Sequence, residues 1–354
     1  METLLISGGC GFVGSNLAVR FKDKQPELRV VALDNLKRRG SELNVPRLQD
    51  HGVEFIHGDI RNREDLHAAG PFDCIMECSA EPSVLAGYNS SPDYIVNTNL
   101  LGTINCLEVA RKHSADFIFL STSRVYPIAH LRNIRLNERE TRYETAPYQE
   151  LPGVSLEGIN ELFPLDGPRS LYGATKLASE LLLQEYIDIY GLRGVVNRCG
   201  VISGPWQMGK EEQGVVALWV ARHLWGRGLN YIGFGGSGKQ VRDILAVDDL
   251  FEFLIRQIEM LDSINGQVFN VGGGPEMSIS LLELTALCSE VVGRQIPIGT
   301  TPETRPGDVP FYVTDCSKIH SHIEWKPKKS LQDIVLDITG WLRANESSVR
   351  KILG

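Results

Sequence analysis

Short β-rich runs alternate with helical patterns along residues 3–198, and this alternation limits the possible folds more than any other feature. The runs are near-continuously apolar, as expected for strands that are buried on both faces. The predicted strands are Thr3–Ser7, Arg29–Asp34, Val53–His57, Cys74–Cys78, Asp116–Ser121 and Gly194–Arg198. The predicted helices are Val13–Lys22, Asn62–Ala69, Asp93–Lys112 and Leu171–Tyr190. The pattern predicts an α/β fold with a doubly wound parallel sheet covered by helices on both faces.

The later part of the chain predicts a second, smaller α/β lobe. Helices are expected at Gln213–Gly226, Asp248–Met260, Leu281–Val292 and Leu331–Ala344. With 354 residues the chain is long enough for more than one domain. We expect a first domain at residues 1–200, joined discontinuously by part of 243–272, and a lobe formed by residues 201–242 and 273–354. Within the first domain, the segment Pro127–Arg169 separates two of the predicted site motifs. It holds five prolines and little periodicity. A flexible linker is one interpretation; we favour an excursion that folds over a ligand.

Charge and cysteine usage exclude several classes of protein. The formal net charge of −8 argues against a nucleic-acid partner, which usually meets a basic face. The seven cysteines are scattered and contain no Cys-x-x-Cys pair, so we expect reduced thiols in a cytoplasmic protein and no metal site. No apolar run is long enough to span a membrane, and we expect no membrane partner.

A glycine loop directly follows the first predicted strand. Gly8-Gly-Cys-Gly-Phe-Val-Gly14 opens a helix, where glycines permit a tight turn and let backbone N–H groups approach a pyrophosphate. Such a pattern alone is weak evidence, but its place between a strand and a helix strengthens it. Asp34 ends the second strand, where its carboxylate would accept hydrogen bonds from an adenosine ribose and repel a 2′-phosphate. The loop therefore predicts NAD rather than NADP.

Two features near this loop each allow two interpretations. Lys37-Arg38-Arg39 could host a phosphate or form a solvated loop, and Asp34 favours the solvated loop. Asp59, after the third strand, could cap a helix or meet the adenine.

Tyr172 and Lys176 stand four residues apart in SLYGATKLASE and share one face of a helix. A phenol ordinarily ionises near pH ~10. A nearby ammonium and an oxidised nicotinamide favour the phenolate, which then acts as a general base on a substrate hydroxyl. The alternative is a packed tyrosine with a solvated lysine. Ser121, Thr122 and Ser123, at the end of the fifth strand, could hold the hydroxyl or simply form a turn.

Several motifs together resemble the extended short-chain dehydrogenase/reductase family: GGCGFVG, LDNL, HGDI, NTNLLGT, STSRVY and YGATK. Within that family, ECSAEPSVLAGY, NRCGVISGP and GFGGSGKQVRD are most similar to the CDP-paratose (CDP-tyvelose) 2-epimerase branch. The resemblance implies a Rossmann-type fold and an isomerase. It would epimerise a nucleotide-diphosphate sugar with NAD, by oxidation to a keto intermediate and re-reduction on the opposite face. The alternatives are another nucleotide-sugar epimerase such as a 4-epimerase, a nucleotide-sugar dehydrogenase or reductase, and a non-enzymatic NAD-binding redox sensor.

The resemblance also implies roles for individual residues. It places catalysis on Thr122, Tyr172 and Lys176, and substrate binding on Thr122, Arg242 and Arg305. The two arginines would meet the diphosphate, or else pair with Asp243 and Asp308. Its cofactor contacts fall on Gly8, Gly11, Phe12, Val13, Asp34, Asn35, Asp59, Ile60, Ser79, Ala80, Asn99, Tyr172, Lys176 and Cys199.

Four further expectations concern specificity, one loop and assembly. Sugar dehydratases of the family carry Asp-Glu after the threonine, whereas this chain has Ser123-Arg124, which disfavours dehydration. Val201 replaces an asparagine that many members carry, which weakens the transfer of substrate contacts from the 4-epimerases. Residues 233–239, GFGGSGK, are expected to form a hairpin turn, and the resemblance implies a homo-oligomer, dimer or tetramer, through 93–112 and 171–190.

Overall fold

The computed structural model describes residues 1–209 and 213–353, which form two compact units. Unit 1 comprises Met1–Val125, Leu171–Arg198 and Phe251–Phe269. Unit 2 comprises Tyr126–Ser170, Cys199–Leu250 and Asn270–Gly354. Residues 126–170, which the sequence placed with the first domain, fall in unit 2.

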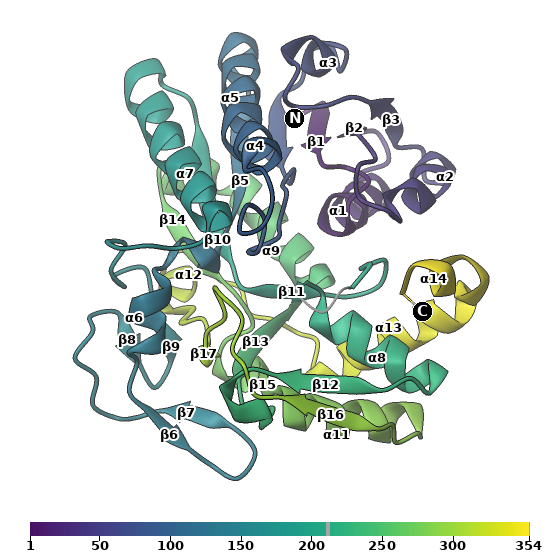
Figure 1. Ribbon diagram of the computed structural model, residues 1–354. Coiled ribbons are helices and arrows are strands. Elements are labelled where there is room, and N and C mark those ends of the chain that lie inside the picture. Colours follow the sequence, from purple (N-terminus) through teal and green to yellow (C-terminus); the bar gives the residue numbers. More distant parts are fainter. Residues whose placement is uncertain (210–212, 354) are drawn as a thin grey trace. The chain divides into compact units, whose positions relative to one another are not determined.

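The main sheet has seven strands in the order β14-β10-β5-β4-β1-β2-β3 (Figure 1). The strands are β1 (Thr3–Ser7), β2 (Arg29–Asp34), β3 (Glu54–His57), β4 (Cys74–Glu77), β5 (Asp116–Thr122), β10 (Gly194–Cys199) and β14 (Val268–Val271). The pairs β1–β2, β1–β4, β2–β3 and β4–β5 are parallel. The predicted doubly wound parallel sheet is confirmed, while β14 is a strand that the sequence did not predict.

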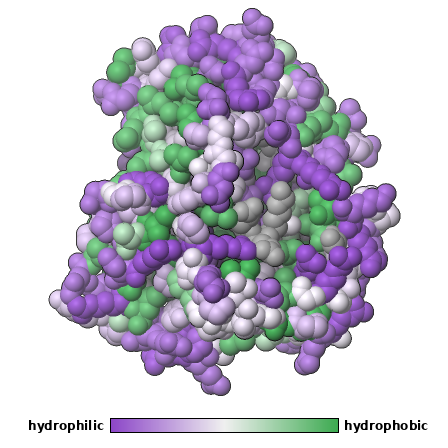
Figure 2. All heavy atoms as spheres, in the orientation of Figure 1, coloured by the Kyte–Doolittle hydropathy of each residue, from purple (hydrophilic) through white to green (hydrophobic). Residues whose placement is uncertain are grey.

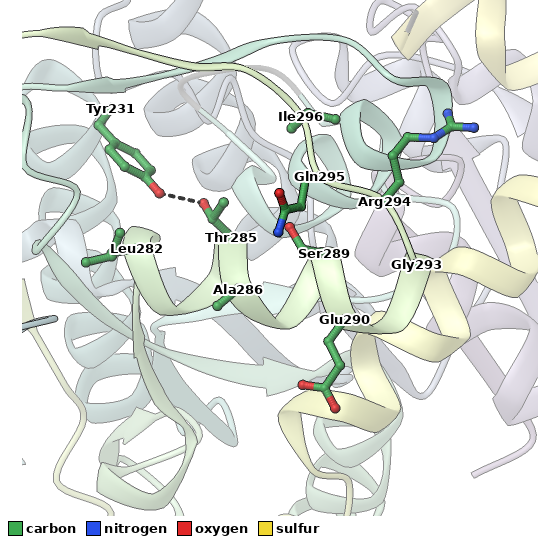
Figure 3. Close-up of a pocket in the computed structure, with 10 residues that line it drawn as sticks. All are labelled: Tyr231, Leu282, Thr285, Ala286, Ser289, Glu290, Gly293, Arg294, Gln295 and Ile296. Atoms are coloured by element: carbon green, nitrogen blue, oxygen red, sulfur yellow. Dashed lines mark hydrogen bonds between the residues drawn. The ribbon is translucent and has the colours of Figure 1, made fainter.

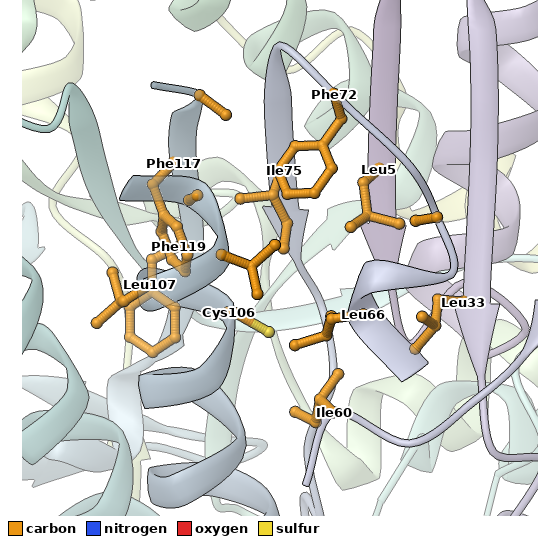
Figure 4. Close-up of a cluster of buried hydrophobic side chains, with 14 of the residues drawn as sticks. Leu5, Leu33, Ile60, Leu66, Phe72, Ile75, Cys106, Leu107, Phe117 and Phe119 are labelled. Carbon is orange, nitrogen blue, oxygen red and sulfur yellow. The ribbon is translucent and has the colours of Figure 1, made fainter. Parts of the chain in front are cut away.

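Both faces of this sheet are buried. Leu5 and Ile75 pack into one cluster with side chains of α3 (Arg63–His67), α5 (Gly102–His113) and α7 (Leu171–Tyr190), as Figure 4 shows in part. Because side chains alternate along a strand, Leu4 and Ile6 face the other way, and they are also fully buried. On helices outside this cluster, Phe21 of α1 (Phe12–Lys24) and Phe251 of α9 (Val247–Glu259) pack edge to face at 5.0 Å between ring centroids.

The helix expected at 93–112 is interrupted. It consists of α4 (Asp93–Val96), a π-helical turn at Asn97–Leu101, and α5. A π-helical turn within an α-helix often accompanies a functional position. The short helix α2 (Asn44–Asp50) was not predicted, whereas α7 has the expected bounds.

Outside residues 126–170, the described part of unit 2 contains three longer helices and two small sheets. The helices α8 (Val215–Trp225), α11 (Leu281–Val292) and α13 (Leu331–Ala344) lie close to the positions predicted for them. One sheet joins β11 (Val201–Ser203), β13 (Val241–Ala246), β15 (Ser278–Ser280) and β17 (Phe311–Tyr312). The other joins β12 (Leu229–Ile232) and β16 (Ile298–Thr301) in parallel. Two shorter helices of unit 2 are α12 (Ser317–His322) and α14 (Glu346–Leu353), while the short helix α10 (Leu261–Ile264) belongs to unit 1.

The glycine-rich residues 233–239 do not form the predicted hairpin. They connect β12 to β13, which belong to different sheets, and contain a 3-10 turn at Phe234–Gly236. The hairpin prediction was wrong because the partner of β12 is β16, which lies far away in the sequence. The segment leads into the strand β13.

Residues 126–170 are folded rather than a flexible linker. They contain α6 (Ile128–Arg132) and two hairpins, β6 (Leu136–Glu138) with β7 (Tyr143–Thr145) and β8 (Val154–Ser155) with β9 (Gly158–Ile159). Within unit 2, the Ile159 N–H donates to the Val313 carbonyl at 2.8 Å, and Arg142 pairs with Glu283 at 2.7 Å. Whether this segment covers a ligand stays a prediction.

In the described part of the chain, no helix combines the length and hydrophobicity needed to cross a membrane. The same residues contain no group of three or more side chains placed to hold a metal ion. On the face drawn in Figure 2, hydrophilic and hydrophobic residues are interspersed.

Candidate active site

The glycine loop after β1 fits a phosphate group. Gly8 has φ +67°, and a Cβ there would come within 2.9 Å of the Cys78 backbone. A Cβ on Gly14 would overlap the Gly8 carbonyl oxygen. Among the described residues, no side chain caps α1 at Gly11, and the first backbone N–H groups of a helix attract anions. Phe12 and Val13 form the first turn of this helix. The loop therefore has the backbone approach that a pyrophosphate requires.

Asp34 lies beside this loop, as predicted from its place at the end of β2. Its carboxylate accepts the N–H of Cys10 at 3.0 Å and the N–H of Leu36 at 2.8 Å. Burial raises the pKa of Asp34, although these N–H groups oppose the rise. The loop and the carboxylate are thus held together by direct hydrogen bonds.

Asp59 and Asn35 form a second polar group at the same end of the sheet. Asn35 Nδ2 donates to Asp59 Oδ2 at 2.8 Å, and Arg61 pairs with the same oxygen at 2.6 Å. Burial acts to raise the pKa of Asp59, but hydrogen bonds from Arg61 and Asn35 outweigh it and lower the pKa to about 2. The helix cap considered for Asp59 is made by Asn62, whose side chain accepts the Glu64 N–H.

Two other predicted cofactor residues have mainly structural contacts. The Ile60 side chain is buried in the core cluster with Leu66 and Leu33 (Figure 4). Asn99 is buried in the π-helical turn, where Oδ1 accepts the Glu81 N–H at 2.7 Å and Nδ2 donates to the Glu81 carbonyl at 3.1 Å. Asn99 therefore holds the loop after β4 that carries Ser79 and Ala80. Direct contact of these residues with a cofactor stays a prediction.

Lys176 is a buried residue of α7. Its side chain is 2% exposed, and its ammonium nitrogen lies 3.5 Å from Glu77 Oε2 and 4.5 Å from the ring centroid of Phe119. A contact of 3.5 Å also joins it to the Ser79 carbonyl. The alternative of a solvated lysine is therefore wrong. Tyr172 stands one turn earlier on the same helix.

The three hydroxyls at the end of β5 have different surroundings. Ser121 donates to Glu180 Oε1 at 2.5 Å, and Glu180 also pairs with Arg198 of β10 at 2.7 Å. Thr122 Oγ1 accepts the Arg124 N–H at 3.1 Å, and Ser123 begins a 3-10 turn. Ser121 is thus committed to a buried network, which leaves Thr122 as the better candidate for a substrate hydroxyl.

Sequence reasoning missed Glu77 and Glu180, the two carboxylates that pair with buried cations here. Glu180 could have been found, because it follows Lys176 by four residues and extends the face formed by Tyr172 and Lys176. Glu77 gave no local signal, since its partner lies 99 residues away.

The predicted substrate residues of unit 2 are partly engaged within the protein. Arg242, on β13, pairs with Asp308 at 3.1 Å and donates to the Val309 carbonyl at 2.7 Å. The Arg305 carbonyl accepts a hydrogen bond from Arg132 at 3.4 Å. The ion pair considered for Arg242 is thus present, with Asp308. Asp243 is fully buried, and burial raises its pKa. Cys199 is buried at the end of β10, and Val201 begins β11.

Unit 2 also has a surface pocket of about 680 Å³, drawn in Figure 3. One wall is α11, and Tyr231 of β12 donates to Thr285 at 2.9 Å across it. The residues that line it are Tyr231, Leu282, Thr285, Ala286, Ser289, Glu290, Gly293, Arg294, Gln295 and Ile296. None of these is a predicted catalytic, cofactor or substrate residue, so this pocket is not the candidate active site.

The chain is similar to known proteins over nearly its whole length. The CDP-paratose 2-epimerase of Salmonella typhi is 33% identical over 96% of this chain and 98% of that protein. A dTDP-glucose 4,6-dehydratase of Mycolicibacterium smegmatis is 27% identical over 97% of this chain and 94% of that protein. Among solved structures, a Thermus thermophilus UDP-glucose 4-epimerase in complex with NAD has a TM-score of 0.75 and 29% identity. It covers 96% of this chain and 99% of that chain.

The model of the NAD-dependent epimerase/dehydratase family matches residues 4–272, a range that includes the glycine loop, Asp34, Tyr172 and Lys176. The expected family and the expected NAD dependence are both confirmed at this level. The chain belongs to the NAD-dependent epimerase/dehydratase family.

Proposed function

We propose that this protein epimerises a nucleotide-diphosphate sugar, and that the reaction is the 2-epimerisation of CDP-paratose to CDP-tyvelose. The observation that carries the proposal is the α7 face with Tyr172 and buried Lys176, in the unit that holds the glycine loop and Asp34. The choice of substrate is supported by similarity to the Salmonella typhi enzyme over nearly the whole chain.

The residues of unit 1 provide the proton transfers for this reaction. NAD, when bound, supplies the hydride acceptor and later the hydride donor. The Tyr172 phenolate removes the proton from a sugar hydroxyl as the carbon is oxidised to a ketone, and it returns a proton when the opposite face is reduced. Lys176 stabilises the phenolate by its positive charge. Thr122 orients the hydroxyl through its own side-chain oxygen.

The residues of unit 2 are proposed to bind the nucleotide diphosphate. A guanidinium group can meet phosphate oxygens with two parallel hydrogen bonds. Arg242 already pairs with the carboxylate of Asp308, so a diphosphate would compete with or share that contact. The sugar must rotate between oxidation and reduction while the nucleotide diphosphate stays bound. These arginines are proposed to hold the diphosphate.

Four other functions must be separated from this one. A 4-epimerase or a nucleotide-sugar dehydrogenase would use the same tyrosine, lysine and glycine loop. A dehydratase needs an acid to eliminate water, and Ser123-Arg124 stands where the dehydratases of the family carry Asp-Glu. A redox sensor would need no proton-transferring tyrosine.

The test is turnover of a panel of nucleotide-diphosphate sugars, with the configuration of each ring carbon followed by NMR. We expect inversion at one carbon, C2 of CDP-paratose or CDP-tyvelose, without net formation of NADH. Accumulation of NADH would indicate a dehydrogenase, and loss of water from the sugar a dehydratase. Tyr172→Phe should abolish turnover; equal activity would show that the tyrosine is not the base.

We also propose a homo-oligomer located in the cytoplasm. Leu181, Ile189 and Tyr190 of α7 and Leu101 of the π-helical turn are exposed apolar side chains that a second copy could cover. All seven cysteines are free thiols, as is usual in a reducing compartment. Light scattering of the purified chain tests the assembly.

A further inference from the structure

Glu77 and Lys176 form an ion pair in the interior of unit 1. Glu77 is the last residue of β4, and Lys176 is on α7. Their side chains are 0% and 2% exposed, and the ammonium nitrogen lies 3.5 Å from Glu77 Oε2. Buried Lys and Glu are rare, because removing either charge from water is unfavourable unless it is compensated.

The surroundings of the pair are mostly neutral. The Thr103 hydroxyl donates to Glu77 Oε2 at 3.4 Å, and the Phe119 ring lies 4.5 Å from the ammonium. Glu77 Oε1 has no hydrogen-bond partner among the described residues. On α5, the Cys106 thiol interacts with both charges of the pair, and it stays protonated because burial raises its pKa well above the usual value. On β1, the neutral hydroxyl of Ser7 is close to the Cys106 thiol.

On α7 itself, the neighbours at one turn from Lys176 are Tyr172 and Glu180. Glu180 is committed to Arg198 and Ser121, so Glu77 is the carboxylate that pairs with Lys176.

Stability does not account for this pair. A buried ion pair usually contributes no more to stability than apolar residues of similar size. This one has a single long contact and an oxygen that lacks a donor, which makes it a weak example. A role in the chemistry of its neighbour explains its presence better.

We propose that Glu77 is a positioning residue for the proton transfer: its carboxylate keeps Lys176 in the charged form, and through Lys176 it keeps Tyr172 easy to ionise. The inference rests on the proposed function of Tyr172 and extends it to a residue of β4. Without the carboxylate, the ammonium would be buried with no counter-charge, and burial favours the neutral amine. A neutral amine would no longer stabilise the phenolate one turn away.

The direction of the effect distinguishes this role from its opposite. A carboxylate acting directly on a phenol makes the phenol harder to ionise, because the two like charges repel. A carboxylate acting through Lys176 makes the phenol easier to ionise. Burial raises the pKa of Glu77 itself, and the Lys176 ammonium opposes that rise.

The experiment is a pH titration of the Tyr172 phenol, followed by the absorbance of tyrosinate. For each variant, the absorbance of the same chain carrying Tyr172→Phe is subtracted, which leaves the signal of Tyr172. No substrate or cofactor is added. With Glu77→Gln we expect the Tyr172 midpoint to rise by about one to three pH units, the usual effect of losing an opposite charge nearby. An unchanged midpoint would overturn the proposal, and a lower midpoint would show that Glu77 opposes ionisation.

Two variants show whether the shift passes through Lys176. In a Lys176→Met background, Glu77→Gln should produce no such rise, because the lysine that transmits the effect is absent. A rise of equal size there would contradict the proposal. Glu54→Gln changes an exposed carboxylate on β3 and should leave the midpoint unchanged.

Folding is checked by circular dichroism. If Glu77→Gln does not fold, Glu77→Asp keeps the charge but shortens its reach, and a small rise of the Tyr172 midpoint is expected. If the crystal structure of a folded Glu77→Asp variant shows that the carboxylate still contacts the ammonium, the midpoint should stay unchanged, because the counter-charge is then still in place. Movement of the lysine away from the carboxylate without any change in midpoint overturns it.

This titration separates the two levels of inference. If Tyr172→Phe keeps full turnover while Glu77→Gln still raises the midpoint, the proposed catalytic function fails and the role of Glu77 stands. If Tyr172→Phe abolishes turnover and the midpoint does not respond to Glu77→Gln, the function stands and this inference fails.

Discussion

Ser121, at the end of β5, donates a 2.5 Å hydrogen bond to Glu180 on the α7 face that also carries Tyr172 and Lys176. Glu180 is in turn paired with Arg198 of β10, and all three side chains are buried. The network therefore fixes the strand end that carries Thr122 to the helix that carries the proposed base. It acts on position, since none of its three members is a proposed catalytic residue.

Removing the charge of Glu180 should strongly destabilise the protein. Glu180→Gln removes the carboxylate that pairs with the buried Arg198 guanidinium, and breaking a buried ion pair lowers the free energy of unfolding by about 3–5 kcal/mol. Guanidinium unfolding of the variant measures this. Glu185→Gln, an exposed position on the same helix, should change stability by no more than about 0.5 kcal/mol. A similar small change for both variants would contradict the importance of the network.

The two neighbouring hydroxyls of β5 should respond differently to alanine. Thr122→Ala is expected to reduce kcat about 100-fold, as removal of one positioned donor typically does, with little loss of stability. Ser121→Ala removes a hydrogen bond to a charged group and should lower stability by about 1.5–3 kcal/mol. Thr122→Ser should restore most activity because it keeps the hydroxyl. Steady-state kinetics and unfolding of the three variants check the assignment, and equal kcat values for both alanine variants would refute it.

Asp59 should make the free energy of unfolding depend on pH in the acid range. Its pKa of about 2 in the folded protein lies below the ordinary value for aspartate, about 3.9. The contribution is therefore fully present above pH ~4 and is lost as the pH falls through the folded pKa. Because its partner Arg61 is 41% exposed, we expect an effect of no more than about 1 kcal/mol. Asp59→Asn should flatten the fall in stability over this acid range, measured by thermal unfolding, while leaving stability at neutral pH slightly reduced.

The glycine loop offers a steric test of the phosphate site. A Cβ on Gly14 would overlap the Gly8 carbonyl, so Gly14→Ala should displace the loop and weaken NAD binding at least about tenfold, measured by calorimetry. Gly340, inside α13, has open space around its Cβ position among the described residues. Gly340→Ala should leave NAD binding unchanged and stabilise the helix by about 0.5–1 kcal/mol. Unaltered NAD affinity in Gly14→Ala would contradict the location of the phosphate site.

The parts of the molecule that sequence patterns predicted are those with local causes. Tyr172 and Lys176 are one helical turn apart, and Asp34 directly ends a strand, so short spacings were sufficient. The pairs Glu77–Lys176 and Glu180–Arg198 join separate elements, and neither pairing could be read from the residues around each partner. The same reason explains the mistaken hairpin at 233–239, because β12 pairs with β16 across a long stretch of chain. Residues 126–170 were expected to fold, but their two hairpins were not predicted, since two-stranded hairpins this short carry little periodicity.

The role proposed for Arg242 can be separated from its contact with Asp308. If the guanidinium binds the diphosphate equally in the ground state and the transition state, Arg242→Met should raise KM about tenfold or more with little change in kcat. Asp308→Asn keeps a side chain of the same size and removes the competing carboxylate, so KM should stay equal or fall. Kinetics with the nucleotide sugar identified by NMR measure both. Arg242 would instead be a structural residue if Arg242→Met and Asp308→Asn lost stability to the same extent and neither changed KM. An ion pair that only connects β13 to residues 308–309 would not affect substrate affinity.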